Sequence, residues 1–442
     1  MTDKQNDYTL TEVMQNEYRD WALYTVEERA IPQLIDGLKP VQRMFLYSSI
    51  KNSWSDFRKV SAVAGVLSDY GYNHAETSGM GAGSLMAAPW NNNICLVEGR
   101  GNFGSRLVPE PGAPRYIYTR VHKNFSRYIK DLDLAPEHED PEHEPPDHYI
   151  PVIPLVLANG ATGIATGFST NILPRDPDDL VACCKEWCET GAVKNQPRPL
   201  FPGFSGRVWF DGDRQSWITQ GEVELNGKTT AVISEVPPGW TREKYVKHLD
   251  KLEENNEIGG YEDQCSQGFR FEVKLKRGTT WNREKLVKLF KLEKSMSENL
   301  SVVGPEGKLR EYSDARKVIE DFCEYRTGIL SRRIEKRLTE ARDGLQWLEN
   351  KLEFINRVLD DRVPFKTKKR DELVEMLCDP DSGIPDCPQE NADRLLRIQI
   401  AGLSRDQVDE LKSDIESQKK KVEYWVNTTE SQEFKQDLEE IR

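Results

Sequence analysis

A short run with two tyrosines among arginines, Ala113-Pro-Arg-Tyr-Ile-Tyr-Thr-Arg120, holds the side chains best suited to chemistry in this sequence. A tyrosine phenol, with an ordinary pKa of about 10, is a useful nucleophile at neutral pH only if cations stabilise the phenolate or a base removes its proton. Arg115 and Arg120 are candidates to supply that positive charge. Because a guanidinium binds two phosphate oxygens at once, a phosphodiester is the natural electrophile beside such a tyrosine. We therefore predict that Tyr116, directly after Arg115, is the nucleophile.

The same run also fits an ordinary strand with exposed cations. Ile117, Tyr118 and Val121 are residues that favour strands. Spacing does not choose between Tyr116 and Tyr118. The surrounding sequence has to decide between these interpretations.

The charge of the chain is unevenly distributed. Residues 21–130 hold 13 Lys and Arg against 8 Asp and Glu, which is +5 within a chain of net charge −13, so the remainder carries −18. A basic region inside an acidic protein predicts a local site for a polyanion, with little general adhesion to nucleic acid. A solvated charge bias without function is the competing interpretation.

Periodicity predicts several elements around the tyrosine run. Residues 41–50 and 60–70 have helical patterns, the second after the basic pair Arg58-Lys59, and Ser78–Ser84 predicts a tight turn into a helix. Residues 121–132 predict an amphipathic helix with Lys123, Arg127 and Lys130 in a cationic stripe suited to a DNA backbone. The acidic, proline-interrupted residues 131–150 predict an extended connector, with a metal site at their three histidines as the less favoured alternative.

The segment after residue 150 predicts a buried strand followed by turns. It places Ile164 between Gly163 and Ala165, where it is either a core side chain or an apolar wedge that kinks DNA. Residues 176–310 alternate short helical and strand patterns and predict a separate α+β domain without a chemical motif of its own.

The last third of the chain has strict heptad spacing. Apolar residues from Ile334 to Leu359, and a second series from Val408 to Trp425, recur at alternating steps of three and four. Two such helices joined by a connection of about 45 residues predict an antiparallel coiled coil with a small globular tip. The apolar surface of that tip suits self-association.

Length and composition limit the remaining possibilities. A chain of 442 residues is too long for one core and predicts about three domains. The polar N-terminus is no signal peptide, no apolar stretch of about 18 residues occurs, and the eight cysteines lack paired metal-binding spacing. We expect a soluble protein with reduced thiols, located in the cytoplasm and without a membrane partner.

Five segments, in order, resemble the breakage-reunion core of type IIA DNA topoisomerases. They read ERAIPQLIDGLKPVQR, YNHAE, GRGNFGSR, APRYIYTR and YIPVIPLVLANGATGIATG. With the coiled coil, the resemblance covers nearly the whole chain. In its length, and in its lack of an ATPase or metal-carboxylate (toprim) segment, the chain most resembles the branch of the family found in T-even-type bacteriophages. In that branch a medium subunit carries the breakage-reunion part of an enzyme that acts in the host cytoplasm.

The resemblance implies a role for individual residues. Tyr116 would form a transient 5′-phosphotyrosyl link with DNA, with Arg115 as its electrostatic partner and with Arg29 and His74 at the scissile phosphate. Lys39 and Arg43 match positions on DNA, and Ile164 matches the isoleucine that intercalates. Together with the cations identified in the sequence, the expected DNA-binding set is Lys39, Arg43, Arg58, Lys59, Lys123, Arg127 and Ile164.

The resemblance also implies an architecture and partners. The expected fold is α+β and multidomain: a winged-helix domain with an N-terminal arm over 1–150, an α/β tower domain over 151–312, and a coiled coil over 313–442 with a dimerisation tip at about 360–403. We expect a homodimer through that tip and the DNA gate, and a large subunit with ATPase and toprim domains. That subunit would bind ATP and hold Mg²⁺ on its carboxylates, so no metal is expected in this chain.

The chain departs from the family pattern at two places. It has Tyr72-Asn-His-Ala-Glu76 where bacterial members often have His-Pro-His-Gly-Asp, and Gln42-Arg-Met44 where they have His-Arg-Arg. The expected activity is ATP-dependent relaxation and decatenation. The alternatives are a non-catalytic DNA-bridging coiled-coil protein and a supercoiling gyrase-type subunit, which the chain's end at Arg442 disfavours.

Overall fold

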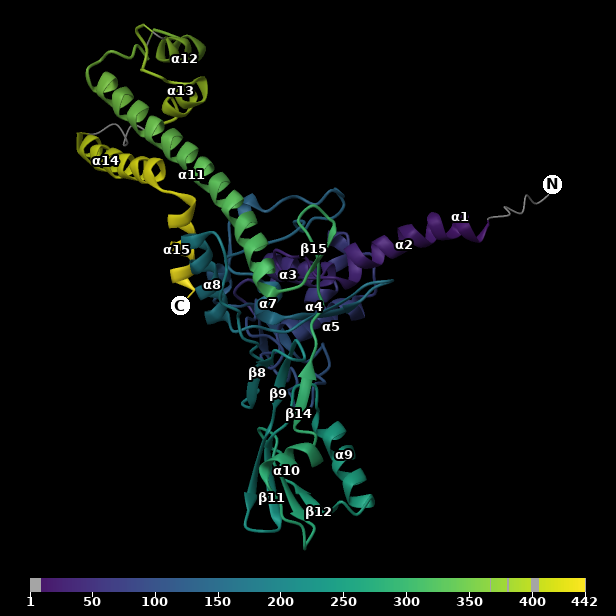
Figure 1. The fold of residues 1–442 in the computed structure, drawn as a ribbon. Helices are drawn as coiled ribbons and strands as arrows, with labels where there is room; N and C mark the ends of the chain where they lie inside the picture. The colour runs from purple at the N-terminus through teal and green to yellow at the C-terminus, as the bar shows by residue number, and fades with distance from the viewer. Residues whose placement is uncertain (1–8, 366, 380, 399–404, 442) are drawn as a thin grey trace, which may run out of the picture. The chain divides into compact units, whose positions relative to one another are not determined.

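The computed structural model has a mixed α+β fold and describes residues 9–365, 367–379, 381–398 and 405–441. It divides into two compact units (Figure 1). Unit 1 comprises Met1–Arg326 and Lys435–Arg442, and unit 2 comprises Thr327–Phe434. The end of the chain thus belongs to the same unit as its beginning.

Unit 1 is built from short helices and small antiparallel sheets. Its helices before the tyrosine run are α1 (Leu10–Gln15), α2 (Glu17–Thr25), the π-helix η1 (Val26–Ala30), α3 (Pro40–Asn52), α4 (Val60–Ala64), the 3-10 helix η2 (Leu67–Tyr70) and α5 (Glu76–Met86). Those after it are α6 (Phe125–Tyr128), the 3-10 helix η3 (Leu132–Leu134), α7 (Leu155–Asn159), α8 (Pro177–Thr190), α9 (Arg242–Glu254) and α10 (Arg283–Leu289).

A three-stranded sheet carries the tyrosine run. Its strand order is β1 (Arg58–Lys59), β3 (Tyr118–Val121), β2 (Val97–Arg100), so β3 is central and antiparallel to both neighbours. Thr119 and Val121 on β3 are buried, whereas Tyr118 and Arg120 alternate with them at intermediate exposure. This alternation is that of a strand with one face on the core.

Unit 1 also contains three two-stranded antiparallel ribbons. They pair β4 (Ile129–Lys130) with β5 (Ile150–Pro151), β6 (Ala161–Ile164) with β7 (Ser169–Ile172), and β15 (Leu300–Val303) with β16 (Leu309–Tyr312). Val303 also forms a parallel bridge with Gln33, which joins β15 to the segment between η1 and α3.

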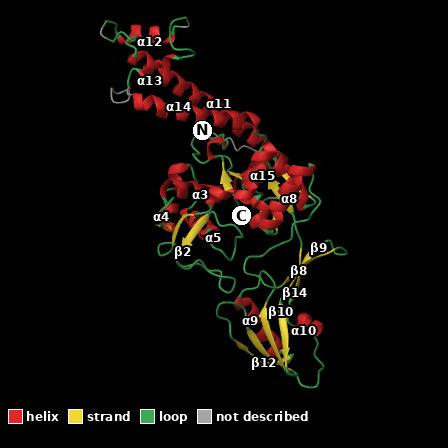
Figure 2. Ribbon diagram, turned by 90° about the vertical axis from the view of Figure 1, so that its left-hand side faces the viewer, coloured by secondary structure: helices red, strands yellow, loops and turns green. Residues whose placement is uncertain are grey.

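The rest of unit 1 holds two larger sheets. One is β14 (Glu293–Met296), β9 (Ser216–Gln220), β8 (Arg207–Asp211); the other is β10 (Glu222–Asn226), β11 (Thr230–Glu235), β13 (Phe271–Leu275), β12 (Ile258–Asp263). Helix α9 packs beside β12 and α10 beside β10 (Figure 2). Tyr245, Phe271 and Phe290 are among the buried side chains of their shared core.

Unit 2 contains most of α11 (Ala315–Leu359), with α12 (Arg370–Cys378), α13 (Gln389–Leu395), α14 (Arg405–Asn427) and the start of α15 (Glu430–Glu440). Helices α11 and α14 contact each other in opposite directions: Ser331 bonds Glu430 just beyond α14, and the Gln418 amide donates to the Ala341 carbonyl at 3.0 Å. Ala341, Ile355, Leu411 and Ile415 of the two heptad series are buried. Residues 366, 380 and 399–403 of the expected tip lie outside the described residues.

Four segments differ from the sequence-based prediction. Residues 121–132 form no continuous helix: β3 ends at Val121, α6 is one turn, and Ile129–Lys130 pairs with β5. Residues 60–70 split into α4 and η2, and Ser78–Ser84 lies inside α5 instead of forming a turn. The buried run after Pro151 forms helix α7 before the β6–β7 hairpin. In each case packing against residues distant in the chain overrides a local pattern.

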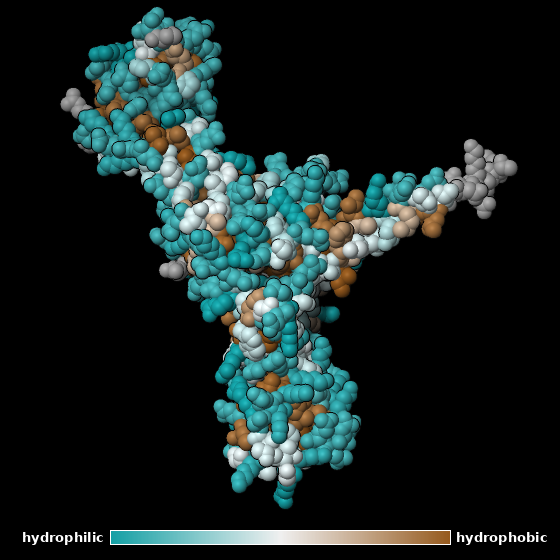
Figure 3. Space-filling model, viewed as in Figure 1, coloured by the Kyte–Doolittle hydropathy of each residue, from teal (hydrophilic) through white to brown (hydrophobic). Residues whose placement is uncertain are grey.

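Two longer elements agree with their patterns. Residues 41–50 lie within α3, and Ile334–Leu359 lies within the 45-residue helix α11. Among the described residues, no helix is both long and apolar enough to cross a membrane. Helices α1 and α2 instead carry exposed apolar side chains, including Leu10, Met14 and Trp21 (Figure 3).

Candidate active site and DNA-contact residues

Tyr116 lies on a turn immediately before the central strand β3. Its backbone N–H donates to the Ala113 carbonyl at 2.8 Å, which closes the turn, and its side chain is 72% exposed. Arg115, beside it, is also exposed. By contrast, Tyr118 is part of β3, paired with Lys59 on one side and Arg100 on the other, and only partly exposed. Exposure therefore favours Tyr116 where spacing could not choose.

The backbone of this turn is held on both sides. Ile117 is 2% exposed and its carbonyl accepts from the Val60 N–H at 3.0 Å, while the Pro114 carbonyl accepts from the Ser61 N–H at 3.2 Å. Gly101, with φ +120°, approaches Ile117 so closely that a Cβ there would lie 3.0 Å from the Ile117 side chain. Only glycine readily combines this φ with such an approach. The backbone on both sides of Tyr116 is thus anchored to neighbouring segments.

The cations near the turn fall into two groups. Arg120 donates to Glu98 at 2.9 Å and lies 4.4 Å above the Phe57 ring, so its charge is already paired. Arg58 and Lys59, on the adjacent strand β1, are exposed. The prediction that Arg120 supplies charge to the tyrosine is therefore not supported by the geometry, and Arg115 is the nearer source.

Arg29 and His74, the other two expected phosphate contacts, come together in a separate cluster. The His74 Nε2 lies 2.7 Å from the Tyr24 hydroxyl, and its ring packs edge-on to Tyr72 at 5.4 Å. Burial raises the pKa of the Tyr72 phenol, and the positive charge of nearby Arg29 opposes part of that rise. Arg29 on η1 and His74 just before α5 are both exposed, so this cluster presents two basic side chains at one surface.

No hydrogen bond or ring contact within the described part of the chain links Tyr116 or Arg115 to Arg29 or His74. The four residues predicted to act together therefore form two groups in a single copy: the tyrosine turn, and the Arg29–His74 cluster.

Ile164 occupies the end of strand β6, at the tip of the β6–β7 hairpin. It is 88% exposed, which rules out the interpretation of this residue as a core side chain. Gly163 packs so closely on the Ala30 carbonyl that a Cβ would lie 2.1 Å from that oxygen. The hairpin tip is thereby seated against η1, the element that carries Arg29.

Lys39 supports the same hairpin. Its Nζ donates to the Thr162 carbonyl at 2.8 Å, and burial lowers the pKa of its ammonium group. Lys39 thus lies at the base of the hairpin that exposes Ile164. It is only partly exposed, so one side of it remains open to a ligand.

Arg43 does not lie on the surface. It is 5% exposed, its Nε donates to Asp36 at 2.8 Å and its Nη2 donates to Asp36 and to the Leu38 carbonyl, both at 3.1 Å. Asp36 also accepts from the Leu38 and Tyr149 backbone N–H groups. The expectation that Arg43 contacts DNA is therefore corrected: its guanidinium is enclosed in the core, where it joins α3 to the segments around it.

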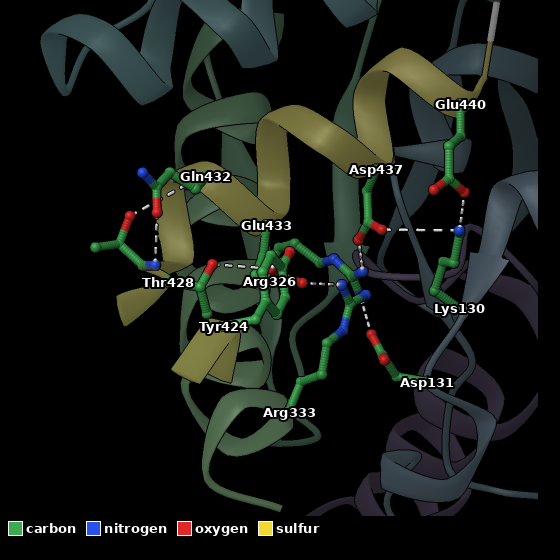
Figure 4. A network of polar contacts seen from close by, with 11 residues as sticks. Lys130, Asp131, Arg326, Arg333, Tyr424, Thr428, Gln432, Glu433, Asp437 and Glu440 are labelled. Atoms are coloured by element: carbon green, nitrogen blue, oxygen red, sulfur yellow. Dashed lines mark hydrogen bonds and ion pairs between the residues drawn. The ribbon is translucent and has the colours of Figure 1, made fainter. Parts of the chain in front are cut away.

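The predicted cationic stripe of Lys123, Arg127 and Lys130 also contains both exposed cations and a paired one. Lys123 and Arg127, before and within α6, are exposed. Lys130 instead contacts Glu440 of α15 and lies 3.8 Å from Asp437, which in turn bonds the buried Arg326 (Figure 4). Lys130 therefore fastens the end of the chain within unit 1 instead of lying along a DNA backbone.

The sequence-based prediction missed a basic groove lined by residues between 207 and 294 of unit 1. The groove has a volume of about 1130 Å³ and is lined by seven basic side chains: Arg207, Arg214, Lys244, Arg283, Lys288, Lys291 and Lys294. Burial and the positive charge of Lys244 lower the pKa of Lys294. Arg283, Lys288, Lys291 and Lys294 are close together in the sequence. The fold adds Arg207, Arg214 and Lys244, up to 87 positions from Lys294, so the sequence shows only part of the basic set.

Within the described residues, no group of three or more His, Cys, Asp or Glu side chains is arranged to hold a metal ion. The three histidines of residues 131–150 are separated in role: His138 and His143 stack at 3.9 Å, while His148 lies between Asp147 and Tyr325.

Comparison with known proteins agrees with this geometry. The family model for the A subunit of DNA gyrase/topoisomerase IV matches residues 29–440. The chain therefore belongs to that family, whose chains cleave and rejoin DNA in type II topoisomerases.

Individual proteins similar to this chain indicate the same family. The DNA topoisomerase medium subunit of Enterobacteria phage T4 is 36% identical over 99% of this chain and 99% of its own length. DNA topoisomerase 2 of Penicillium chrysogenum is 27% identical over 93% of this chain but only 28% of its own. The Plasmodium falciparum topoisomerase II DNA-binding, cleavage and re-ligation domain superposes with a TM-score of 0.83 at 25% identity, covering 97% of this chain and 62% of that one.

The chain is thus similar to one phage subunit throughout, and to a part of the longer eukaryotic enzymes. This supports the role in DNA cleavage and religation and not the alternative of a non-catalytic DNA-bridging protein.

The buried Asp36–Arg43 pair makes a prediction about stability. Asp36→Asn leaves the Arg43 guanidinium buried without its counter-ion, which costs about 3–5 kcal/mol of the free energy of unfolding. Urea unfolding followed by circular dichroism measures this loss. The control, Arg58→Gln on the exposed strand β1, should change stability by less than about 0.5 kcal/mol. Normal stability of Asp36→Asn would contradict the structural role of Arg43.

Proposed function

We propose that Tyr116 is the nucleophile that breaks one DNA strand and stores the bond as a 5′-phosphotyrosyl link. The observation that carries this proposal is an exposed phenol on a backbone-anchored turn beside the exposed Arg115, in a chain of this family. Transesterification exchanges one phosphodiester for another, so rejoining needs no external energy. Two copies of the chain place one tyrosine on each strand, which yields a double-strand break for passage of a second duplex.

Arg115, Arg29 and His74 are proposed to stabilise the phosphate during this exchange. Charge develops on the phosphoryl oxygens as the phenol attacks, and preorganised cations lower the free energy of that state. Arg115 is adjacent to Tyr116, and the Arg29–His74 cluster presents a second pair of donors. No hydrogen bond or ring contact among the described residues links the two groups within one copy of the chain. We expect bound DNA to place its scissile phosphate against both groups.

The DNA-contact set is proposed to comprise Lys39, Arg58, Lys59, Lys123, Arg127 and Ile164, with Arg43 now left out. Exposed cations on β1 and around α6 suit backbone phosphates. Ile164, 88% exposed on a seated hairpin, suits insertion between base pairs, where an apolar wedge unstacks one step and kinks the duplex. Lys39 at the base of that hairpin suits the phosphate beside the wedge.

The basic groove is proposed to extend these contacts to flanking DNA. Lys244, Lys288 and Lys291 are exposed along it. The pKa of Lys294 is lowered by burial and by the positive charge of Lys244, and a bound anion would offset both effects. In fold terms, residues 1–150 are proposed as a winged-helix domain, 151–312 as the tower that carries this groove, and 313–442 as the coiled coil with its tip.

Cofactors and partners are proposed to lie largely outside this chain. By likeness to the family, Mg²⁺ is assigned to carboxylates of a large partner subunit with toprim and ATPase domains, which also binds ATP. Residues of the tip at about 360–403, and the DNA gate, are proposed to form a homodimer. Relaxation and decatenation in the cytoplasm of a host cell are the expected activities, by likeness to the phage relative.

The role of Tyr116 predicts the outcome of a trapping experiment. With plasmid DNA, Mg²⁺ and the large subunit, detergent should trap a covalent protein–DNA complex with the native chain and with Tyr118→Phe but not with Tyr116→Phe. The phenylalanine variant keeps the ring and loses the attacking oxygen, so adducts should fall below about one-thousandth of the native level. Adducts that persist in Tyr116→Phe and vanish in Tyr118→Phe would transfer the role to Tyr118.

Cleavage should also depend on the partner. The isolated chain should bind DNA yet form almost no covalent adduct with Mg²⁺, because the cations of this chain alone do not neutralise the transferring phosphate. Titrating the large subunit should restore the adduct in proportion to complex formed. Robust Mg²⁺-dependent cleavage by the pure chain would show that it holds the metal itself.

The basic groove predicts a length-dependent loss of DNA affinity. Changing Lys244, Lys288 and Lys291 together to Gln should weaken binding of a long duplex and reduce the slope of log affinity against log salt by up to about 2.7, or about 0.9 per phosphate contact. A duplex that covers only the cleavage site should bind as before.

A matched triple variant controls for the loss of positive charge. It changes Lys228, Lys274 and Lys276 to Gln. These lysines are exposed on or beside the four-stranded sheet formed by β10, β11, β13 and β12, and they do not line the groove. Equal effects of the two triple variants would rule out a specific groove contact.

A further inference from the structure

The ring of His74 is held by a residue that lies outside every motif identified in the sequence. The Tyr24 hydroxyl, from helix α2, lies 2.7 Å from His74 Nε2, although the two residues are 50 positions apart. This is the distance of a normal hydrogen bond between a hydroxyl and a nitrogen. Both side chains are exposed, so nothing in the core forces the two groups together. The contact is a specific polar pairing at the surface that carries Arg29.

This hydrogen bond selects one form of the imidazole. A neutral histidine carries one ring N–H, and the nitrogen that accepts a hydrogen bond cannot be the one that carries the proton. If the Tyr24 hydroxyl donates to Nε2, the proton of neutral His74 resides on Nδ1. The Nδ1–H is then the ring donor that remains for a phosphate oxygen.

The groups around His74 are compatible with an incoming anion. Tyr24 from α2 and Tyr72 from the segment before α5 contact its ring, and Arg29 from η1 acts electrostatically on Tyr72. Glu76, in the first turn of α5, follows His74 by two residues in the sequence. Arg29 is the cation of this set and Glu76 the carboxylate.

We propose that Tyr24 is a positioning residue for strand cleavage: it donates to His74 Nε2 and so fixes the tautomer whose Nδ1–H donates to the scissile phosphate. This inference rests on the proposed role of His74 in DNA cleavage. Tyr72, one of the residues at which this chain departs from the family pattern, also packs its ring on His74.

Selection of the tautomer has a pH dependence of definite sign. When an imidazole is protonated, both ring nitrogens carry protons, so Nδ1–H is present whether or not Tyr24 is there. When the ring is neutral, the single proton is shared between the two nitrogens unless a hydrogen bond such as that of Tyr24 selects one of them. Loss of the Tyr24 hydroxyl should therefore matter at high pH and not at low pH.

The experiment measures rates of covalent complex formation for the full chain with its large subunit, Mg²⁺ and DNA. Tyr24→Phe should slow cleavage about fivefold at pH 8, the effect of one lost hydrogen bond, and less than about twofold at pH 5.5. Tyr18→Phe, an exposed tyrosine on the same helix α2, is the control and should match the native chain at both pH values. In a His74→Ala background, Tyr24→Phe should have no further effect.

A second measurement detects the tautomer directly. With ¹⁵N-labelled histidine, of which the chain has six, ring ¹⁵N shifts should place the proton of His74 on Nδ1 at pH 8, and Tyr24→Phe should move it toward Nε2. A native His74 protonated on Nε2 overturns the proposal, as does a Tyr24→Phe defect that is equal at both pH values or persists without His74. Failure of the native protein to form any adduct, with the Nδ1 tautomer intact, would instead count against the proposed function.

Discussion

The chemistry of this chain depends on one constraint: an exposed phenol must stand at a fixed place without being packed into the core. The structure meets it through the backbone. Ile117 is buried and its carbonyl is bonded to Val60, while Pro114 is bonded to Ser61, so the turn that carries Tyr116 is held from both sides. Since the anchors are backbone groups and one buried neighbour, the side chain between them is free to face a substrate. The three-stranded sheet and its neighbours therefore hold the turn that carries Tyr116 in place.

Basic side chains serve two different purposes in this molecule. Arg43, Arg120 and Lys130 are paired with carboxylates, and in the core such pairs are needed because a buried charge without a partner is costly. Arg29 and Arg115 are exposed and present their charge to solvent. In the sequence these arginines and lysines look alike. Their division into structural cations and accessible cations is decided by which carboxylates the fold places beside them.

Much of the fold was predictable where the pattern was long or the chemistry distinctive. The helix at residues 41–50 and the long helix through Ile334–Leu359 agree with their apolar periodicity, because such patterns bury one face in any packing. Shorter segments were mispredicted. Residues 121–132 have the spacing of an amphipathic helix, yet Ile129–Lys130 pairs with Ile150–Pro151, since a strand partner distant in the chain satisfies the same backbone groups. Local pattern cannot reveal such a partner.

Residue types and their order are enough to indicate the family, the Arg115–Tyr116 pair and Ile164 as a candidate wedge. Packing in three dimensions leaves Tyr116 exposed while Tyr118 is held in a strand, encloses Arg43 beside Asp36, and brings seven cations around one groove. Each of these outcomes depends on contacts between residues far apart in the chain. Exposure, charge pairing and tautomer are properties of neighbours in space, and the order of residues does not specify those neighbours.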